Sequence, residues 1–166
     1  MAALSATATV QPYRAGALGA VARMHGEYYS KHWGLARTFE CQVARGLADL
    51  LERADSGRDG FWTVAVDGEI VGSIAIDGHG DPAEGARLRF FLVDESRQRL
   101  GIGRLLVGEA LAFCERAGHR RVFLWTFAGL DAARALYERN GFRLVDERSD
   151  ARWGVALTEQ KFVREG

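Results

Sequence analysis

The dipeptide Asp67-Gly68 stands between two apolar runs, residues 61–66 and 70–76. Asp-Gly is favoured in the two-residue turn that joins antiparallel strands, because both central residues of that turn need positive φ. The two runs are therefore predicted to form a β-hairpin. A hairpin excludes a sheet built only from parallel strands, so this pattern restricts the chain to a mixed or antiparallel sheet.

The segments on either side of the hairpin complete the predicted order of elements. Further strands are expected at residues 10–13, 87–93, 121–126, 142–147 and 153–163. Helices are expected at residues 17–31, from an N-cap at Thr38 to about residue 54, at 102–117 and at 130–139. Because strands and helices do not alternate uniformly, the pattern predicts an α/β fold of the α+β type with a mixed sheet.

The chain has 166 residues, of which 48% are hydrophobic, so it can bury a core of its own. We expect residues 1–166 to form a single domain, with residues 1–9 as a flexible lead-in. Lys and Arg balance Asp and Glu, and a nucleic-acid partner is not expected because such proteins usually carry a basic excess. No apolar run approaches the roughly 20 residues that span a membrane, so no membrane partner is expected either.

The two cysteines, Cys41 and Cys114, are far apart in the sequence and lie in no metal-ligand spacing. A disulfide framework or a metal site is therefore not expected, and a reducing cytoplasm is the default location. Cys114 falls on an apolar helical stripe, which predicts a buried thiol.

A glycine-bearing turn connects the strand at residues 87–93 to the helix at Ile102. Gly101 and Gly103 allow close approach of a ligand to the backbone, and the free N–H groups of the helix start attract anions. Arg97, Arg99 and Arg104 add positive charge. The turn is predicted to bind a diphosphate, and its glycine spacing fits neither the Rossmann fingerprint nor a P-loop.

Two segments resemble the signatures of the GNAT acetyltransferase superfamily. Gln98-x-x-Gly101-x-Gly103, after a strand that ends at Val93, is similar to the Q/R-x-x-G-x-G/A signature. Residues 135–142, with the sequence ALYERNGF, resemble the second signature, A-L-Y-x-x-x-G-F. More narrowly, the chain is similar to the acetyltransferase half of proteins that carry a MarR-type DNA-binding domain in front. Only that half is present, so DNA binding is not carried over.

The resemblance implies a fold and a cofactor, acetyl-CoA. The expected fold has a mixed, mostly antiparallel central sheet of about seven strands, splayed at the fourth and fifth strands, with about four helices. The diphosphate would be held by the backbone of the turn: Arg99, Leu100, Gly101, Ile102, Gly103 and Arg104, beside Gln98. The pantetheine arm would pair with the preceding strand at Phe91, Leu92 and Val93. Many members place an Asn where this chain has Leu130, so Thr126 or Asp131 compensates or that contact is absent.

Tyr137, in the second signature, has two interpretations. The resemblance implies a general acid that protonates the departing thiolate, and a phenol with a pKa of roughly 10 can do so. The alternative is an aromatic ring packed between helix and sheet. Its place in the signature favours the catalytic role.

The acceptor side is predicted from the first helical segments. His25 or Glu27 is the candidate base, against the ordinary alternatives of a hydrogen-bonded histidine and an exposed glutamate. Tyr29, Trp33, Trp125 and Trp153 are candidate substrate contacts, with core packing as the alternative. Arg89 either pairs with Glu84 or Asp94 or binds a carboxylate on the acceptor.

The leading hypothesis is therefore an acetyl-CoA-dependent N-acetyltransferase acting on a small primary amine, such as an amino acid. A protein N-terminal or lysine acetyltransferase is the second hypothesis, and a non-catalytic acyl-CoA-binding regulatory module is the third. The sequence leaves the oligomeric state open, and a homodimer is one of the states considered.

Overall fold

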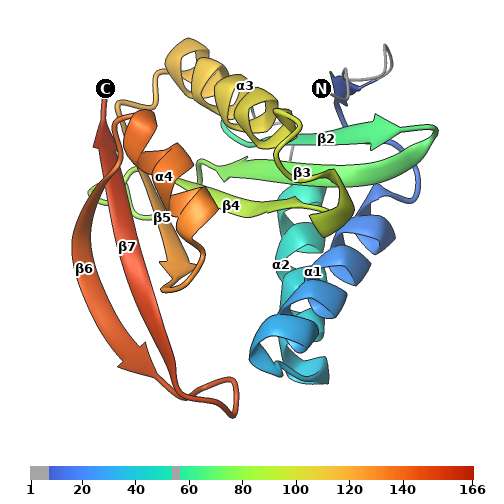
Figure 1. Cartoon of the computed structure of the whole chain (residues 1–166). Helices are drawn as coiled ribbons and strands as arrows, with labels where there is room; N and C mark the ends of the chain where they lie inside the picture. Colours follow the sequence, from blue (N-terminus) through green and yellow to red (C-terminus); the bar gives the residue numbers. More distant parts are fainter. Residues whose placement is uncertain (1–7, 54–56) are drawn as a thin grey trace.

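The computed structural model describes residues 8–53 and 57–166. These residues form one seven-stranded sheet and four α-helices (Figure 1). The strands are β1 (Thr9–Gln11), β2 (Gly60–Val66), β3 (Glu69–Asp77), β4 (Ala86–Val93), β5 (Arg121–Phe127), β6 (Arg143–Asp150) and β7 (Leu157–Glu165). The helices are α1 (Ala17–Trp33), α2 (Arg37–Glu52), α3 (Ile102–Ala117) and α4 (Asp131–Arg139), with a short 3-10 helix η2 (Glu95–Arg97).

The strand order in the sheet is β1-β2-β3-β4-β5-β7-β6. The β4–β5 pair is parallel and every other neighbouring pair is antiparallel, which confirms the predicted mixed, mostly antiparallel sheet. The predicted hairpin is also confirmed, since Val66 pairs with Glu69 across Asp67 (φ 51°) and Gly68 (φ 83°). Positive φ at both central residues is the geometry of a type I′ turn.

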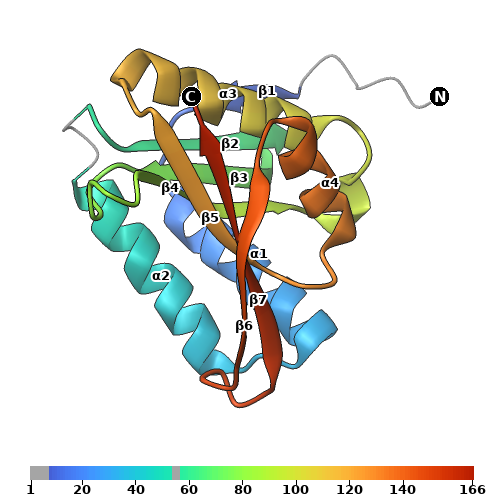
Figure 2. The ribbon, with the colours of Figure 1, turned by 90° about the vertical axis from the view of Figure 1, so that its left-hand side faces the viewer.

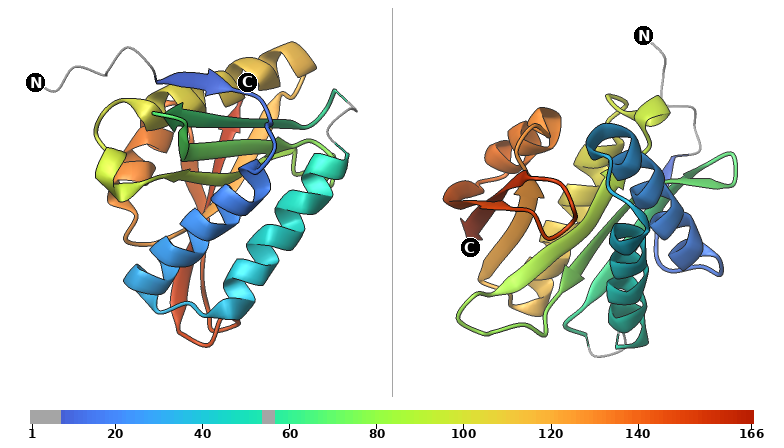
Figure 3. Two further views of the ribbon diagram at one scale, coloured as in Figure 1. Left: turned by 90° about the vertical axis from the view of Figure 1, so that its right-hand side faces the viewer. Right: turned by 90° about the horizontal axis from the view of Figure 1, so that it is seen from below.

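Two pairs of helices sandwich the sheet. α1 and α2 cover one face, and α3 and α4 lie on the other, as Figure 1 and the two views of Figure 3 show. The core is correspondingly divided into two clusters. The larger packs α3 and α4 against the sheet and includes Leu106, Cys114 and Phe162, while the smaller packs α1 and α2 and includes Val21 and Leu47. Burial of Cys114 confirms the sequence prediction for that thiol.

The sheet opens between β4 and β5. The two strands pair only at their beginnings, Ala86 with Val122 and Arg87 with Phe123. Beyond these pairs, β5 and the β6–β7 hairpin swing away from β4, as Figures 1 and 2 show. The hairpin tip comes back beside the start of α2, where the Trp153 ring lies 5.3 Å from the Phe39 ring. The splay at the fourth and fifth strands is therefore confirmed.

Several predicted boundaries were wrong. Ala36, not Thr38, is the N-cap of α2, and it supplies no side-chain cap. β6 continues to Asp150, and β7 begins at Leu157 instead of residue 153, because a tight turn intervenes. In that turn the Gly154 N–H donates to the Ala151 carbonyl at 3.0 Å. The predicted lead-in covered residues 1–9. Residues 1–7 lie outside the described residues, and Thr9 is already the first residue of β1.

None of the helices in the described ranges is both long enough and apolar enough to cross a membrane.

Candidate active site

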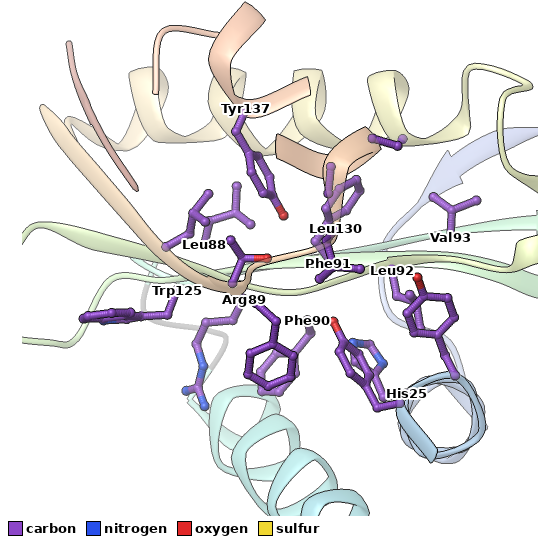
Figure 4. Close-up of a pocket in the computed structure, with 18 of the residues that line it drawn as sticks. His25, Leu88, Arg89, Phe90, Phe91, Leu92, Val93, Trp125, Leu130 and Tyr137 are labelled. Atoms are coloured by element: carbon purple, nitrogen blue, oxygen red, sulfur yellow. The ribbon is translucent and has the colours of Figure 1, made fainter. Parts of the chain in front are cut away.

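A cavity of about 900 Å³ occupies the opening between β4 and β5. It runs from the turn before α3, past α4, to the aromatic side chains of α1 and α2. Figure 4 shows Tyr137 reaching in from the α4 side, while His25, Phe90 and Arg89 lie on the side of α1 and α2. One cavity therefore joins the predicted cofactor turn to the predicted acceptor residues.

The turn before α3 presents free backbone donors to this cavity. Gly101 is the N-cap of α3 with φ 85°, and Arg99 is also left-handed, with φ 66°. The first helical hydrogen bond runs from the Leu105 N–H to the Gly101 carbonyl at 3.1 Å, so the preceding N–H groups have no helical partner. Gln98 braces the turn, since its Nε2 donates to the Val93 carbonyl at 3.1 Å. This arrangement suits a diphosphate.

Most of the predicted cofactor residues line the cavity. Among them are Phe91, Leu92, Val93, Gln98, Arg99, Gly101, Gly103 and Arg104. Ile102 does not, because its side chain is buried in the core at 1% exposure, and Leu100 is also outside the lining. Their backbone N–H groups stay predicted diphosphate contacts.

A bulge in β4 shapes the middle of the cavity. The β3–β4 register shifts between Ser73 and Ala75, and Phe90 adopts φ 53°. The Ser73 hydroxyl donates to the Phe90 carbonyl at 2.7 Å and so holds the distorted strand. Because β5 has already diverged, the β5-facing edge of residues 88–93 has no strand partner. That edge is free to pair with an extended ligand.

Tyr137 is 4% exposed and belongs both to the core and to the cavity wall. Its ring packs against Phe91, Phe142 and Phe162 at centroid distances of 5.9 to 6.2 Å. Within residues 8–53 and 57–166 its hydroxyl makes no hydrogen bond. Burial, and to a smaller extent Tyr29, raises the pKa of this phenol, so it stays protonated at neutral pH. Tyr137 can therefore pack in the core and also present a protonated hydroxyl at the cavity wall.

Leu130, at the position where many GNAT members carry Asn, is the N-cap of α4 and lines the cavity. Its apolar side chain can pack on a ligand but cannot hydrogen-bond it. Thr126 and Asp131, the expected substitutes, line the same cavity, so the structure places both where they could supply a polar contact.

His25 and Tyr29 lie together at the α1 side of the cavity. The Nδ1–H of His25 is placed to donate to the Val21 carbonyl at 2.8 Å, which leaves Nε2 as the acceptor nitrogen. Burial lowers the pKa of His25 to about 4, despite the opposing hydrogen bond to Val21. Tyr29 stacks on His25 with ring centroids 6.2 Å apart, and burial raises the pKa of its phenol. His25 is therefore a neutral imidazole.

Two predicted acceptor residues lie outside the cavity lining. Glu27 is exposed on the outer face of α1 and pairs with Arg23 at 3.6 Å, so it is removed from the candidate bases. Trp33 stands behind the wall, with its ring 5.5 Å from Tyr29 and 5.9 Å from Phe127. Trp33 therefore packs against residues that line the cavity but does not line the cavity itself.

Trp125 and Trp153 do line the cavity, at its β5 and β6–β7 side. Arg148 lies over the Trp125 ring at 4.0 Å and pairs with Glu159 at 3.5 Å. Arg152 binds the same Glu159 at 2.5 Å. Sequence reasoning missed these two arginines and the buried Glu159, because their meeting depends on the β6–β7 register that pairs Arg148 with Glu159.

Arg89 pairs with neither of its predicted partners. It donates to Asp77 at 3.1 Å, and its guanidinium lies 4.6 Å from the Phe90 ring. Glu84 instead pairs with Lys161, and Asp94 caps η2 by accepting from the Ser96 N–H. The β3–β4 register brings Asp77 within reach of Arg89, which the sequence does not reveal. Arg89 lines the cavity with its charge already balanced.

Asp59, Asp77 and His79 place potential metal-ligand atoms within 4.8 Å of one another. Arg53 donates to both carboxylates, at 3.2 Å to Asp59 and 2.8 Å to Asp77. The two acids therefore already have cationic partners, and we interpret the group as an ion-pair network that supports Arg89.

Comparison with known proteins agrees with this geometry. Residues 18–142 match the model of the acetyltransferase (GNAT) family. N-acetyltransferase family 8 member 3 of Rattus norvegicus is 38% identical over 90 residues, covering 52% of this chain and 40% of the relative. N-acetylaspartate synthetase of Danio rerio is 30% identical over 129 residues, covering 76% of this chain and 45% of the relative. The chain thus spans less than half the length of these two relatives.

Solved structures share the fold at low identity. A GNAT-family acetyltransferase from Staphylococcus aureus Mu50 superposes with a TM-score of 0.75 at 17% identity, covering 96% of this chain and 99% of the other. A ribosomal-protein-alanine N-acetyltransferase from Brucella melitensis gives a TM-score of 0.78 at 15% identity, covering 95% and 99%. At these identities the likeness concerns the fold alone. The family match, which covers most of the chain, shows that the chain belongs to the acetyltransferase (GNAT) family.

Proposed function

We propose that this acyltransferase moves an acetyl group from acetyl-CoA to the primary amine of a small molecule, by direct attack in a ternary complex. The GNAT family generally uses acetyl-CoA as its acyl donor. The observation that carries the proposal is the continuous cavity, which has anion-binding N–H groups at one end, Tyr137 in its wall and aromatic rings at the other end.

The residues present fit coenzyme A. The N–H groups at the start of α3 suit its diphosphate, and the unpaired edge of β4 suits the amides of its pantetheine arm. When bound, acetyl-CoA supplies a thioester, which is an activated acetyl group. Arg99 and Arg104, at the turn, add positive charge beside the phosphate position.

Tyr137 is the proposed general acid. The sulfur that leaves the thioester carries negative charge in the same low-dielectric surroundings that raise the pKa of the Tyr137 phenol. Burial makes both the phenolate and the thiolate less stable, so it does not by itself oppose proton transfer between them. Transfer of the phenol proton to sulfur as the C–S bond breaks would give a neutral thiol, and the Tyr137 phenolate would then recover its proton through water from the one that the amine releases.

The amine must lose a proton before or during its attack on the carbonyl carbon. His25 has an acceptor nitrogen, but with a pKa of about 4 it cannot retain a proton at neutral pH. Its proposed role is to accept a hydrogen bond from the amine and to pass the proton on to water. The pH dependence of turnover should then follow the ammonium group of the acceptor, whose pKa is roughly 10, and not a protein base.

Two features favour a small acceptor over a protein. The acceptor end of the cavity is walled by aromatic side chains, among them Tyr29, Phe39, Trp125 and Trp153, and its charged groups are mostly arginines. This lining is not acidic, as a groove that suits a lysine side chain on a protein would be. N-acetylaspartate, in the name of one relative, is an acetylated amino acid and fits the same proposal.

The test is release of free coenzyme A thiol from acetyl-CoA in the presence of a panel of small amines, with mass spectrometry of the product. Thiol release that depends on a small amine, with one acetyl group gained by that amine, supports the proposal. Acetylation of lysine-bearing or N-terminal peptides alone would favour a protein acetyltransferase. Tight binding of acetyl-CoA with no amine-dependent thiol release would favour the regulatory binding module.

A further inference from the structure

Arg87 is a half-buried cation without a partner among the described residues. It lies on β4 opposite Asp77 of β3 and beside Phe123 of β5, at the point where the sheet begins to open. Its side chain lines the cavity, and its Nε is buried with no hydrogen-bond partner. In the ranges 8–53 and 57–166 the guanidinium forms neither a hydrogen bond nor an ion pair. A guanidinium that is partly removed from water and unpaired is unfavourable unless an anion or another acceptor pairs with it.

The other arginines at this end of the cavity are already paired. Arg89 binds Asp77, Arg148 binds Glu159, and Arg152 binds both Glu159 and Asp150. Arg53 and Asp59 belong to the same network through Asp77, so among the described residues five arginines, counting Arg87, face four carboxylates, which leaves one positive charge in excess. Desolvation and then the charge of Arg89 lower the pKa of Arg87 to about 10, and Asp77 and Glu159 compensate only in part. The surroundings lack one anion.

A second donor in the cavity wall is also unpaired. Trp153, in the turn between β6 and β7, lines the cavity and packs its ring on Phe39. Its Nε1–H is buried and has no acceptor among the described residues. Indole and guanidinium nitrogens only donate hydrogen bonds. Arg87 Nε and Trp153 Nε1 therefore both lack an acceptor among the described residues, and an atom of a ligand or a water molecule can supply it.

We propose that Arg87 determines acceptor specificity by binding the carboxylate of an amino acid. This inference rests on the proposed function, because it names the substrate class for the same cavity. An amino acid whose amine is neutral and ready to attack carries one negative charge in total, which equals the local excess of positive charge. Arg89, for which carboxylate binding was one of two alternatives drawn from the sequence, already has Asp77 as its anion.

Charge removal at Arg87 provides the test. Acceptors are compared in matched pairs with and without the carboxylate: phenylalanine with phenethylamine, leucine with 3-methylbutylamine, and 4-aminobutyrate with propylamine. For the parent protein, kcat/KM should favour the best carboxylate-bearing acceptor over its matched amine by roughly 10²-fold or more, since loss of one partner of a buried charge pair has effects of this size. Arg87→Met should abolish that preference, chiefly through the acceptor KM, while turnover of the carboxylate-free amines persists. Arg87→Lys should restore part of it.

Arg121→Met is the matched control. Arg121 also has a buried Nε without a partner, but it lies outside the cavity lining and pairs with Glu165 at 3.1 Å. This variant should keep the parent preference. A readout independent of turnover is calorimetric binding of the preferred amino acid to protein saturated with free coenzyme A, which Arg87→Met should abolish. Thermal melting shows whether each variant is folded.

The outcomes separate the two proposals. If no amine of either kind is acetylated, both the proposed function and this inference fail. If amines are acetylated but the parent shows no preference for carboxylate-bearing acceptors, only this inference is overturned. Retention of the preference by folded Arg87→Met overturns it equally.

Discussion

Replacement of Gly103 by valine should weaken coenzyme A binding. A Cβ at Gly103 would stand 3.3 Å from Phe91 Cζ, 3.4 Å from Leu136 Cδ2 and 3.8 Å from Val93 Cγ2. All three side chains line the cavity, so the γ-methyl groups of valine, about 1.5 Å further out, would enter the space predicted for the cofactor. Loss of one N–H bond to a charged phosphate is worth about 1.5–3 kcal/mol, which raises Kd by roughly 10- to 150-fold.

Gly108→Val is the control for this experiment. Gly108 lies in the same helix, and a Cβ there would meet nothing within 4 Å. The substitution makes the same change in helix propensity, in which valine is slightly better than glycine. Calorimetric titration with coenzyme A should show an unchanged Kd for Gly108→Val and a weakened one for Gly103→Val. Equal affinity in both variants, with both folded, would refute the position of the diphosphate.

Three further substitutions test other parts of the account. Tyr137→Phe should lower kcat by about 10²–10⁴-fold with little change in acetyl-CoA affinity, and a parent-like kcat with chemistry rate-limiting would reduce Tyr137 to a packing residue. His25→Asn should reduce the acid limb of the stability curve, which is the loss of unfolding free energy at low pH measured by urea unfolding. The pKa of His25 is about 4 in the folded state and 6.5 in the unfolded state. The stability that the neutral imidazole contributes is therefore complete above pH 6.5 and is lost as pH falls towards 4, by about 3 kcal/mol in all. An unchanged acid limb would contradict the burial of a neutral imidazole. Ser73→Ala removes the buried donor to the Phe90 carbonyl and should lower the free energy of unfolding by about 1–3 kcal/mol, whereas no loss would show that the bulge does not depend on it.

The parts of the site that the sequence predicted are those that short segments determine. Asp67-Gly68 specifies its own turn, and Gly101 and Gly103 specify a strand–turn–helix connection within a few residues. Tyr137 could be placed because its signature is contiguous. These features depend on local backbone requirements, so they can be read without knowledge of the sheet.

The acceptor side depends on contacts between distant segments. Glu159 meets Arg148 because of the β6–β7 register, and Arg89 meets Asp77 because of the β3–β4 register. A shift of one residue in either register would turn those side chains to the other face. Glu27 and Trp33 had residue types that suit a pocket, but the rotation of α1 places one in solvent and the other behind Tyr29. Neither the strand register nor the rotation of a helix can be derived from the spacing of residues in the sequence.

Acetyl transfer with Tyr137 as general acid is tested most directly by a time course of free coenzyme A release from acetyl-CoA, measured for the parent protein and for Tyr137→Phe, with and without amines. Release of coenzyme A should require an amine and should yield acetylated amine in equal amount, and Tyr137→Phe should release it about 10²–10⁴-fold more slowly while it still binds acetyl-CoA. This mechanism would be contradicted by a parent protein that binds acetyl-CoA but acetylates no amine, or by equal rates in the two proteins with chemistry rate-limiting.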